Sequence, residues 1–242
     1  MSITVRQVDI LKAIIKEFMK TADAVGSLTL PDKYKLGISP ATLRAEMTDL
    51  VQQGYLYKEH SSSGRLPTTL GLRFFLDEIL EEEKVDKTKE TNLKEKLFQN
   101  RFNKSVFIKE SVKALSNMTH EVALSLVDDV IYIAGISQLL SYSEFEDLDL
   151  LQNSLDIIES ESLLQSIFNK YKNNNTLRTL IGDEIGIDSL NQCGIVFSPY
   201  KFFRGAKGYI AVFGPRRMRY ARIIPMVRNI SNFIQESISG WE

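Results

Sequence analysis

The sequence predicts an α+β protein of two domains, and three observations lead to that prediction. Over the first eighty residues, apolar side chains recur at helical spacing and are followed by two short extended runs. From residue 105 onward, apolar runs typical of strands alternate with helical segments. Residues 81–104 between them are highly charged, which is typical of a helical or flexible linker. We therefore expect domains at residues 1–80 and 105–242.

The first domain begins with two predicted helices. Apolar residues recur with a helical period over residues 5–20, and Thr4 with Gln7 forms a capping-box pattern at the start of this segment. A second, short helix is predicted over residues 28–35, where Gly37 ends it.

A third helix is predicted to begin after Ser39, a good N-cap, with Pro40 at its first position, and to end near Gly54. Its apolar stripe faces the domain interior and consists of Leu43, Met47, Leu50 and Val51. On the helical wheel, the residues on the opposite side then face outward, namely Thr42, Arg44, Ala45 and Thr48, with the cap Ser39 beside them.

Two extended runs, residues 55–58 and 65–67, flank a polar tip at residues 61–64 and predict a small two-stranded wing. Three helices followed by a wing are the order of the winged helix-turn-helix, in which the third helix enters the major groove of DNA. The first domain is therefore predicted to be a winged helix-turn-helix domain that binds double-stranded DNA.

The outward side chains of the third helix suit the wall of a groove. Arg44 can pair with guanine or clamp a phosphate, and Thr42 and Thr48 can donate, accept or contact a thymine methyl group. The same pattern is also typical of an ordinary exposed helix face. A basic wing favours the DNA interpretation, because a flexible cationic loop can approach a sugar-phosphate backbone closely.

Local charge agrees with that interpretation. Residues 1–75 contain ten bases and seven acids, a net charge of +3, whereas the whole chain carries −1. Ser27, just before the second helix, adds a predicted phosphate contact. The complete set of predicted DNA-binding residues is Ser27, Ser39, Thr42, Arg44, Ala45, Thr48, Lys58, His60, Ser61, Ser63 and Arg65.

The second domain is predicted to mix helices with strands. A two-residue turn at Asp128-Asp129 joins two apolar runs into a hairpin. A final amphipathic helix follows Gly214-Pro215, with Pro225 as a kink. The remaining predicted elements are helices over 106–118 and 148–169, hairpin strands at 122–127 and 130–134, and strands at 177–181, 194–200 and 208–213.

The sequence resembles the HrcA family of heat-inducible transcription repressors. The resemblance lies in three segments in the family's order: RQVDILKAIIKEFMKTADAVGSLTL, LGISPATLRAEMTDLVQQGYLYKEHSSSGRLPTTLGLRFFLDEIL, and IGDEIGIDSLNQCGIVFSPY with GYIAVFGPRRMRYARIIPMV. It covers most of residues 4–80 and 131–238. The resemblance implies a homodimer that binds an inverted-repeat operator ahead of chaperone genes. It also implies a GroEL-type chaperonin as partner and a reduced GAF-like mixed α/β domain at residues 105–242.

The sequence departs from the family pattern in three respects. Ala45 stands where the family usually has asparagine, and Arg216 and Arg219 replace a threonine and an aspartate. The family's inserted dimerising region is also missing, because residues 122–129 run directly into residues 130–137. Either dimerisation uses other surfaces, such as the last helix or the helix from Thr69, or part of the sensing function is lost.

Two blocks of opposite charge leave an alternative open. Residues 144–161 contain seven acids and no base, and residues 201–222 contain seven bases and no acid. The simpler interpretation is a pair of solvated or mutually facing surfaces. The alternative is an anion or regulatory site formed by Arg216, Arg217 and Arg219 at the start of the last helix, where free amides also attract negative charge. Such a site would suit a regulator controlled by a small anionic ligand.

Composition excludes several other classes of function. One cysteine and two histidines leave too few soft ligands for a structural metal site, and no grouping typical of an enzyme occurs. We therefore expect no catalysis, no cofactor and no metal, and Cys193 is predicted to be a buried apolar residue. The sequence indicates a cytoplasmic protein without a membrane span. A protein interaction module that no longer binds DNA remains a further alternative.

Overall fold

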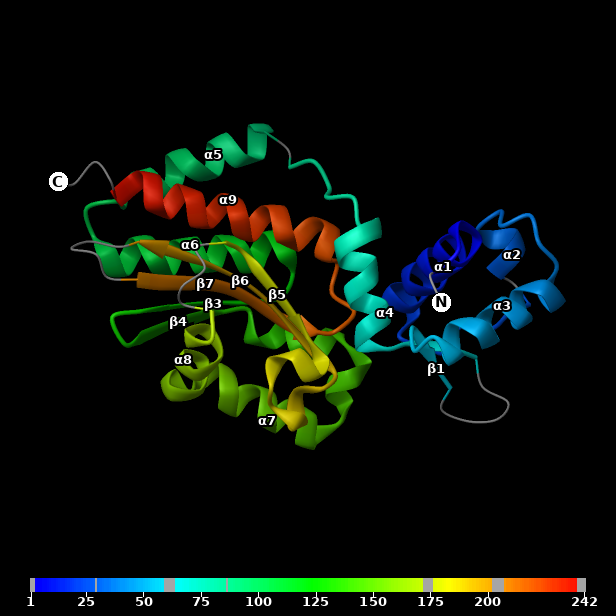
Figure 1. The fold of residues 1–242 in the computed structure, drawn as a ribbon. Coiled ribbons are helices and arrows are strands. Elements are labelled where there is room, and N and C mark those ends of the chain that lie inside the picture. Colours follow the sequence, from blue (N-terminus) through cyan, green and yellow to red (C-terminus); the bar gives the residue numbers. More distant parts are fainter. Residues whose placement is uncertain are drawn as a thin grey trace. The chain divides into compact units, whose positions relative to one another are not determined.

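A computed structural model describes residues 3–28, 30–58, 64–85, 87–171, 176–201 and 207–238. The chain forms two compact units, Met1–Glu81 and Glu82–Glu242, which we call the N-terminal and C-terminal units. Helices and antiparallel strands occur together (Figure 1), so the fold is mixed α+β, as predicted.

The N-terminal unit contains three helices followed by two short strands, the predicted order. Its elements are α1 (Val5–Thr21), α2 (Leu30–Lys33), α3 (Pro40–Gln52), β1 (Leu56–Tyr57), β2 (Leu66–Pro67), α4 (Thr69–Phe74) and a π-helical turn η1 (Phe75–Ile79). The helix α2 is shorter than predicted, because Lys35 and Gly37 both adopt left-handed backbone conformations that a continuing helix does not allow.

Local capping sets the starts of α1 and α3. The Thr4 hydroxyl accepts a hydrogen bond from the Gln7 amide, and the Gln7 side chain accepts one from the Thr4 amide, which completes the predicted capping box. The Ser39 hydroxyl likewise accepts from the Thr42 amide at the start of α3.

The strands β1 and β2 pair antiparallel, with Leu56 opposite Pro67. The segment before α2 forms an isolated bridge next to this sheet, because Val25 and Arg65 exchange two backbone hydrogen bonds of 2.9 Å. The local sequence does not indicate this pairing, since it connects positions forty residues apart. The base of the two-stranded sheet is thus tied to the segment between α1 and α2.

The C-terminal unit is built on an antiparallel sheet of order β4-β3-β7-β6-β5. Its strands are β3 (Val122–Val127), β4 (Val130–Ala134), β5 (Arg178–Ile181), β6 (Cys193–Lys201) and β7 (Lys207–Pro215). Its helices are α5 (Lys87–Phe98), α6 (Lys104–Thr119), α7 (Leu148–Glu159), α8 (Glu161–Asn169) and α9 (Tyr220–Ile238). Short 3-10 helices lie at Ile136–Ser141, Ser143–Glu146, Gly182–Ile185 and Asp188–Leu190.

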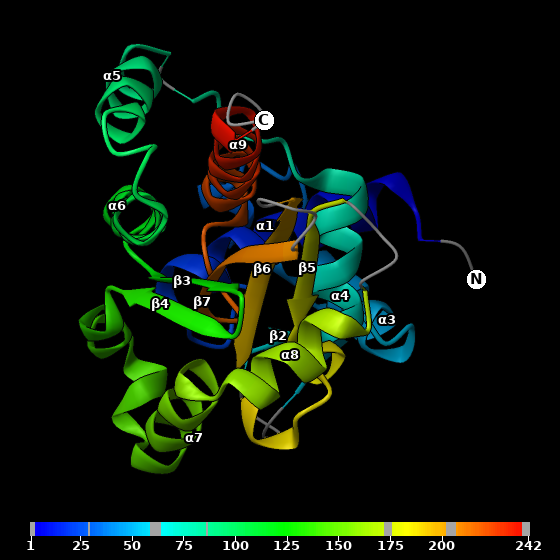
Figure 2. The same cartoon turned by 90° about the vertical axis from the view of Figure 1, so that its left-hand side faces the viewer.

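Helices cover both faces of this sheet (Figure 2), with α6 and α9 on one side and α7 and α8 on the other. The strand β3 shows the resulting alternation. Val122, Leu124 and Leu126 pack in the core cluster shared with α7 and α8, whereas Ser125 lies on the opposite face and hydrogen-bonds to the Tyr200 hydroxyl at 2.7 Å.

Two predicted helix boundaries were wrong. The helix predicted over residues 148–169 is interrupted at Ser160, whose extended backbone ends α7 and whose hydroxyl caps α8. The last helix begins at Tyr220 rather than directly after Gly214-Pro215, because β7 continues through Pro215 in its pairing with β6. Arg216 and Arg217 therefore precede the helix. The free backbone amides of its first turn belong to residues from Tyr220 onward.

The apolar side of α9 is used inside the C-terminal unit. Ile223, Val227, Ile230 and Ile234 are all buried, and α9 contacts β6, β7 and α6. The expectation that this helix offers an open apolar seam to a second copy is therefore not supported. In the part of the chain that the structure describes, no helix is long and apolar enough to cross a membrane.

Candidate nucleic-acid interface

The outward face of α3 is open to solvent. Leu43, Met47 and Leu50 are buried, while the predicted outward residues Thr42, Arg44, Ala45 and Thr48 are all exposed. The amphipathic pattern of the sequence thus gives the orientation of this helix correctly.

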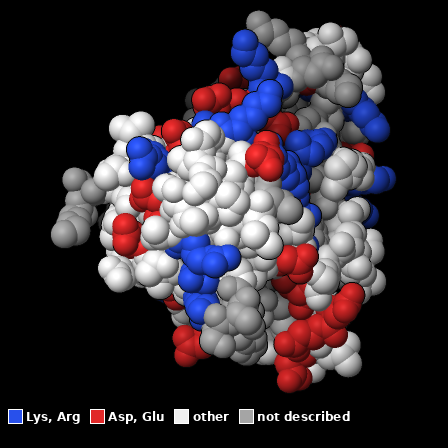
Figure 3. Space-filling model, turned by 90° about the vertical axis from the view of Figure 1, so that its right-hand side faces the viewer, with Lys and Arg blue, Asp and Glu red and all other residues white. Residues whose placement is uncertain are grey.

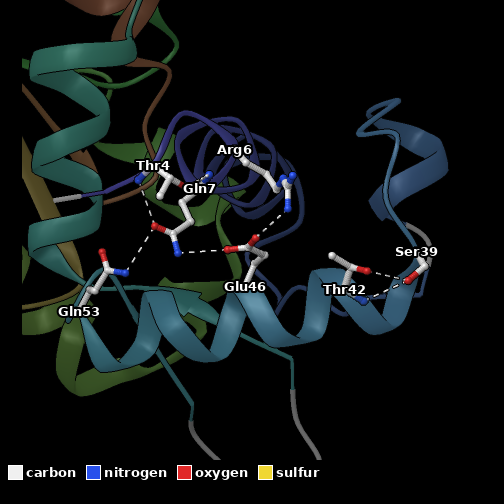
Figure 4. A network of polar contacts seen from close by, with 7 residues as sticks. All are labelled: Thr4, Arg6, Gln7, Ser39, Thr42, Glu46 and Gln53. Atoms are coloured by element: carbon white, nitrogen blue, oxygen red, sulfur yellow. Dashed lines mark hydrogen bonds and ion pairs between the residues drawn. The ribbon is translucent and has the colours of Figure 1, made fainter. Parts of the chain in front are cut away.

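A polar network on the inner side of α3 sets its rotation relative to α1 (Figure 4). The buried Gln7 side chain donates to the Glu46 carboxylate at 3.1 Å and accepts from the Gln53 amide at 3.4 Å. Arg6 also contacts Glu46, at 3.4 Å. These bonds connect the first turn of α1 with the middle and end of α3, so they help hold the polar face of α3 outward.

The sequence interpretation missed this network. It assigned Gln7 only to the capping box and gave Glu46 no role. The available signal was the position of Glu46 next to Leu50 at the edge of the apolar stripe on the helical wheel, where an acid needs a partner when it is partly covered.

The hydroxyl groups on this face are partly engaged. The Ser39 hydroxyl contacts the Thr42 hydroxyl at 2.9 Å besides capping the helix, and Thr48 donates to the Arg44 carbonyl oxygen at 3.0 Å. The guanidinium of Arg44 makes no ion pair with any residue that the structure describes. Arg44 is therefore the side chain on this face with the most hydrogen-bonding capacity for a ligand.

The other predicted contact residues lie in different environments. Lys58 is exposed at the end of β1, whereas Arg65 is half-buried and its backbone pairs with Val25. His60, Ser61 and Ser63 lie outside the described residues. The expectation for Ser27 is not supported, because this residue is only 8% exposed and α2 begins three residues later.

A basic groove of about 610 Å³ also lies in the N-terminal unit, between the first half of α1 and the turn before α3. Its charged lining residues are Arg6, Asp9, Lys12, Lys16 and Lys35. Figure 3 shows one face of the molecule, on which basic side chains form several groups with acidic side chains among them. The sequence interpretation counted these bases in the local charge but did not place them together.

The candidate arginines of the C-terminal unit have internal partners. The Arg217 guanidinium forms two hydrogen bonds with the Glu144 carboxylate, at 2.6 and 3.0 Å, and lies 5.0 Å from the centre of the Tyr142 ring. Arg219 pairs with Glu83 at 3.0 Å. Arg217 thus connects the basic and acidic blocks, as the simpler interpretation expects, and Arg217 and Arg219 each pair with a different acid.

A buried acid lies beside this ion pair. Glu121 is 2% exposed and accepts a hydrogen bond from the Tyr142 hydroxyl. Burial raises its pKa to about 8; the tyrosine bond and the Arg217 charge counteract this shift, and Glu144 adds to it. Its second carboxylate oxygen has no hydrogen-bond partner among the described residues.

Within the described ranges, no three histidine, cysteine, aspartate or glutamate side chains gather in an arrangement that could hold a metal ion. Cys193 is fully buried, as predicted, and burial raises the pKa of its thiol to about 12. Such a thiol remains protonated near neutral pH and is a poor nucleophile.

Comparisons with known proteins agree on one family. A family model described as the HrcA protein C terminal domain matches residues 68–224. A heat-inducible transcription repressor HrcA from Carboxydothermus hydrogenoformans is 23% identical, with 97% of this chain and 98% of the relative covered. The one from Desulforudis audaxviator is 25% identical, with 98% and 99% covered. A solved structure titled a hypothetical protein has a TM-score of 0.81 at 17% identity, covers 100% of both chains, and supports the fold.

These relatives put the protein in the class of transcription repressors, a non-enzymatic class of regulators. The chain belongs to the HrcA family, which confirms the resemblance found in its sequence.

The relatives are longer than this chain within the region of similarity. The alignments span 337 and 341 residues, more than the 242 of this protein, so segments of the relatives have no counterpart here. At the position where the resemblance implies a missing insert, β3 and β4 are joined by Asp128 and Asp129 alone. Both residues have positive φ angles, 48° and 59°, as a tight two-residue hairpin turn requires.

Proposed function

We propose that the N-terminal unit is a winged helix-turn-helix domain that binds operator DNA, with α3 as the recognition helix and β1–β2 as the wing. The observation that carries the proposal is the exposed polar face of α3, which the Gln7–Glu46 network orients away from the core. In a domain of this type the N-terminal part of such a helix contacts base edges in the major groove. Phosphate contacts come from Lys58 and from the lysines of the basic groove.

The repressor acts on an inverted-repeat operator as a homodimer in this proposal. A small domain makes few base contacts, and two linked copies reach useful affinity because the second half-site is bound at high effective concentration. The C-terminal unit serves as a GAF-like regulatory and dimerisation domain in the cytoplasm. The family resemblance supports a GroEL-type chaperonin as its regulatory partner.

A footprint of the purified protein on its own upstream region and on chaperone-gene promoters tests this function. Two protected half-sites related by a two-fold axis are expected, together with a dimer mass in sedimentation. A folded protein that protects none of these regions would favour the interaction-module alternative.

Replacing Arg44 by alanine should cost about 1 to 3 kcal/mol of specific binding and relax the base preference at one position in each half-site. The reason is that the exposed guanidinium can bind guanine with two hydrogen bonds. Fluorescence anisotropy with operator duplexes, each changed at one base pair, measures both effects. Lys109→Ala, on the exposed surface of α6, is the matched control. Unchanged affinity in Arg44→Ala would remove this residue from base recognition.

Replacing Lys58 by alanine should weaken binding to all DNA sequences by a similar factor. It should also reduce the slope of log K against the logarithm of the salt concentration by about one unit. Lys58 suits this test better than Arg65, whose half-buried position in the sheet also serves the fold. Titrations at several salt concentrations on operator and random DNA give the slope. A loss confined to the operator would instead indicate a base contact.

A further inference from the structure

A pocket of about 420 Å³, partly open to solvent, lies within the C-terminal unit and is lined by residues of α5, α6, α9 and the segment before α5. Figure 2 shows α5 outside the layer formed by α6 and α9. This volume is within the range of sites that bind small molecules. The pocket is separate from the ion pair of Arg217 and Glu144 and from the DNA-binding surface proposed above.

The inner wall of the pocket is apolar. Leu97 from α5, Met118 from α6 and Met226 from α9 meet there. A smaller recess shares these three residues and continues to Ile230 and Phe233 of α9. The unbranched, polarisable side chains of the methionines adapt readily to ligands of different shape. The inner end therefore suits a hydrocarbon chain or ring.

The rest of the lining carries an excess of positive charge. Four basic residues, Lys84, Lys96, Lys113 and Arg222, line the pocket together with two acids, Glu83 and Glu110. Glu83 is already paired with Arg219, so it neutralises little of this charge. An anionic group would gain ion pairs with basic side chains from four different parts of the unit, namely the segment before α5 and the helices α5, α6 and α9.

We propose that this pocket binds an amphipathic anion, a small molecule with an apolar body and one carboxylate or phosphate group. The excess of basic residues would repel an apolar cation. An inorganic anion would leave the apolar wall in contact with water. The combination of both surfaces in one pocket selects molecules that carry both features.

The pocket is built partly from the segment that follows the N-terminal unit. Glu82 forms two hydrogen bonds with Arg228, at 2.6 and 2.8 Å, and the Glu83 amide donates to the Ala221 carbonyl oxygen at 2.8 Å. The next residues, Lys84 and Val85, line the pocket. A bound ligand would therefore restrain the segment that connects to the N-terminal unit. This inference rests on the proposed function and adds to it a small molecule that regulates DNA binding.

The test uses the full chain, with binding measured by calorimetry and by the shift in melting temperature. The probes are decanoate and naphthyl phosphate as amphipathic anions, decyltrimethylammonium as a cation with the same tail, and inorganic phosphate. All are kept below micelle-forming concentrations. Both amphipathic anions should bind and raise the melting temperature, because a ligand selective for the folded state stabilises it. The cation and phosphate should bind at least about tenfold more weakly.

Two variants locate the site. The double variant Lys96→Ala, Lys113→Ala should weaken binding of decanoate about tenfold or more, and Ala114→Trp should block it by filling the pocket. Lys109→Ala, an exposed α6 lysine outside the lining, should bind normally. Melting curves without probe show that each variant is folded.

Equal binding of the cationic probe, unchanged binding in the double variant, or no binding of either amphipathic anion would overturn the pocket proposal. Operator affinity with and without decanoate is measured separately, and a change of severalfold is expected. An absence of operator binding under all conditions would overturn the proposed function and leave the ligand site standing.

Discussion

Replacing Arg217 by alanine should lower the free energy of unfolding by about 3 to 5 kcal/mol. The Arg217 and Glu144 side chains are only 11% and 12% exposed, and the guanidinium holds both oxygens of the carboxylate. Removal of one partner leaves a largely buried carboxylate without compensation. The loss therefore exceeds what the two hydrogen bonds alone contribute.

Urea unfolding followed by circular dichroism measures this effect. Arg219→Ala is the matched control, because Arg219 and Glu83 are 66% and 46% exposed and such pairs contribute about 0 to 1 kcal/mol. If the two variants lost similar stability, the Arg217–Glu144 pair would have no special role in the fold.

Replacing Glu121 by glutamine should stabilise the protein increasingly as the pH rises from 5 to 9, with the smallest effect near pH 5. The folded state raises the pKa of this carboxyl from 4.5 to about 8, so it favours the protonated form. The contribution of this protonation to the free energy of unfolding is fully present below pH 4.5 and is lost as the pH rises through 8. At pH 9 the cost of the charged form is on the order of 3 to 5 kcal/mol. Glutamine stays neutral and keeps an acceptor for Tyr142.

Unfolding free energies at pH 5, 7 and 9 for both proteins test this prediction. The difference between the variant and the wild type should grow with pH. Glu159→Gln, an exposed acid at the end of α7, is the control and should show no comparable growth. Parallel pH profiles for Glu121→Gln and the wild type would contradict a buried, neutral Glu121.

The surroundings of Glu121 explain one glycine in the segment that resembles the family. A Cβ atom at Gly214 would lie 2.6 Å from the Glu121 Oε2 atom and 2.9 Å from the Met218 sulfur. Such distances are too short for unbonded atoms, so a side chain would displace the acid. The sequence showed this glycine only as part of a turn before the last helix. Its packing role depends on Glu121, which is more than ninety positions away in the chain.

The sequence by itself determined the elements that local chemistry controls. The cap at Ser39, the outward face of α3 and both strands of the β3–β4 hairpin appear where they were predicted. Each depends on side chains within about four residues, or on a two-residue turn with a strong conformational preference. Family membership was also evident from the order of three segments.

Only the tertiary structure decided the contacts between distant residues. The Gln7–Glu46 bond spans thirty-nine positions and the Arg217–Glu144 pair spans seventy-three. The same is true of the burial of Ser27, the late start of α9 and the pocket beneath α5. Local preferences set which helix or strand forms, but the partner of a buried charge depends on how these elements pack. That packing is a property of the whole chain, because each contact requires many others to form with it.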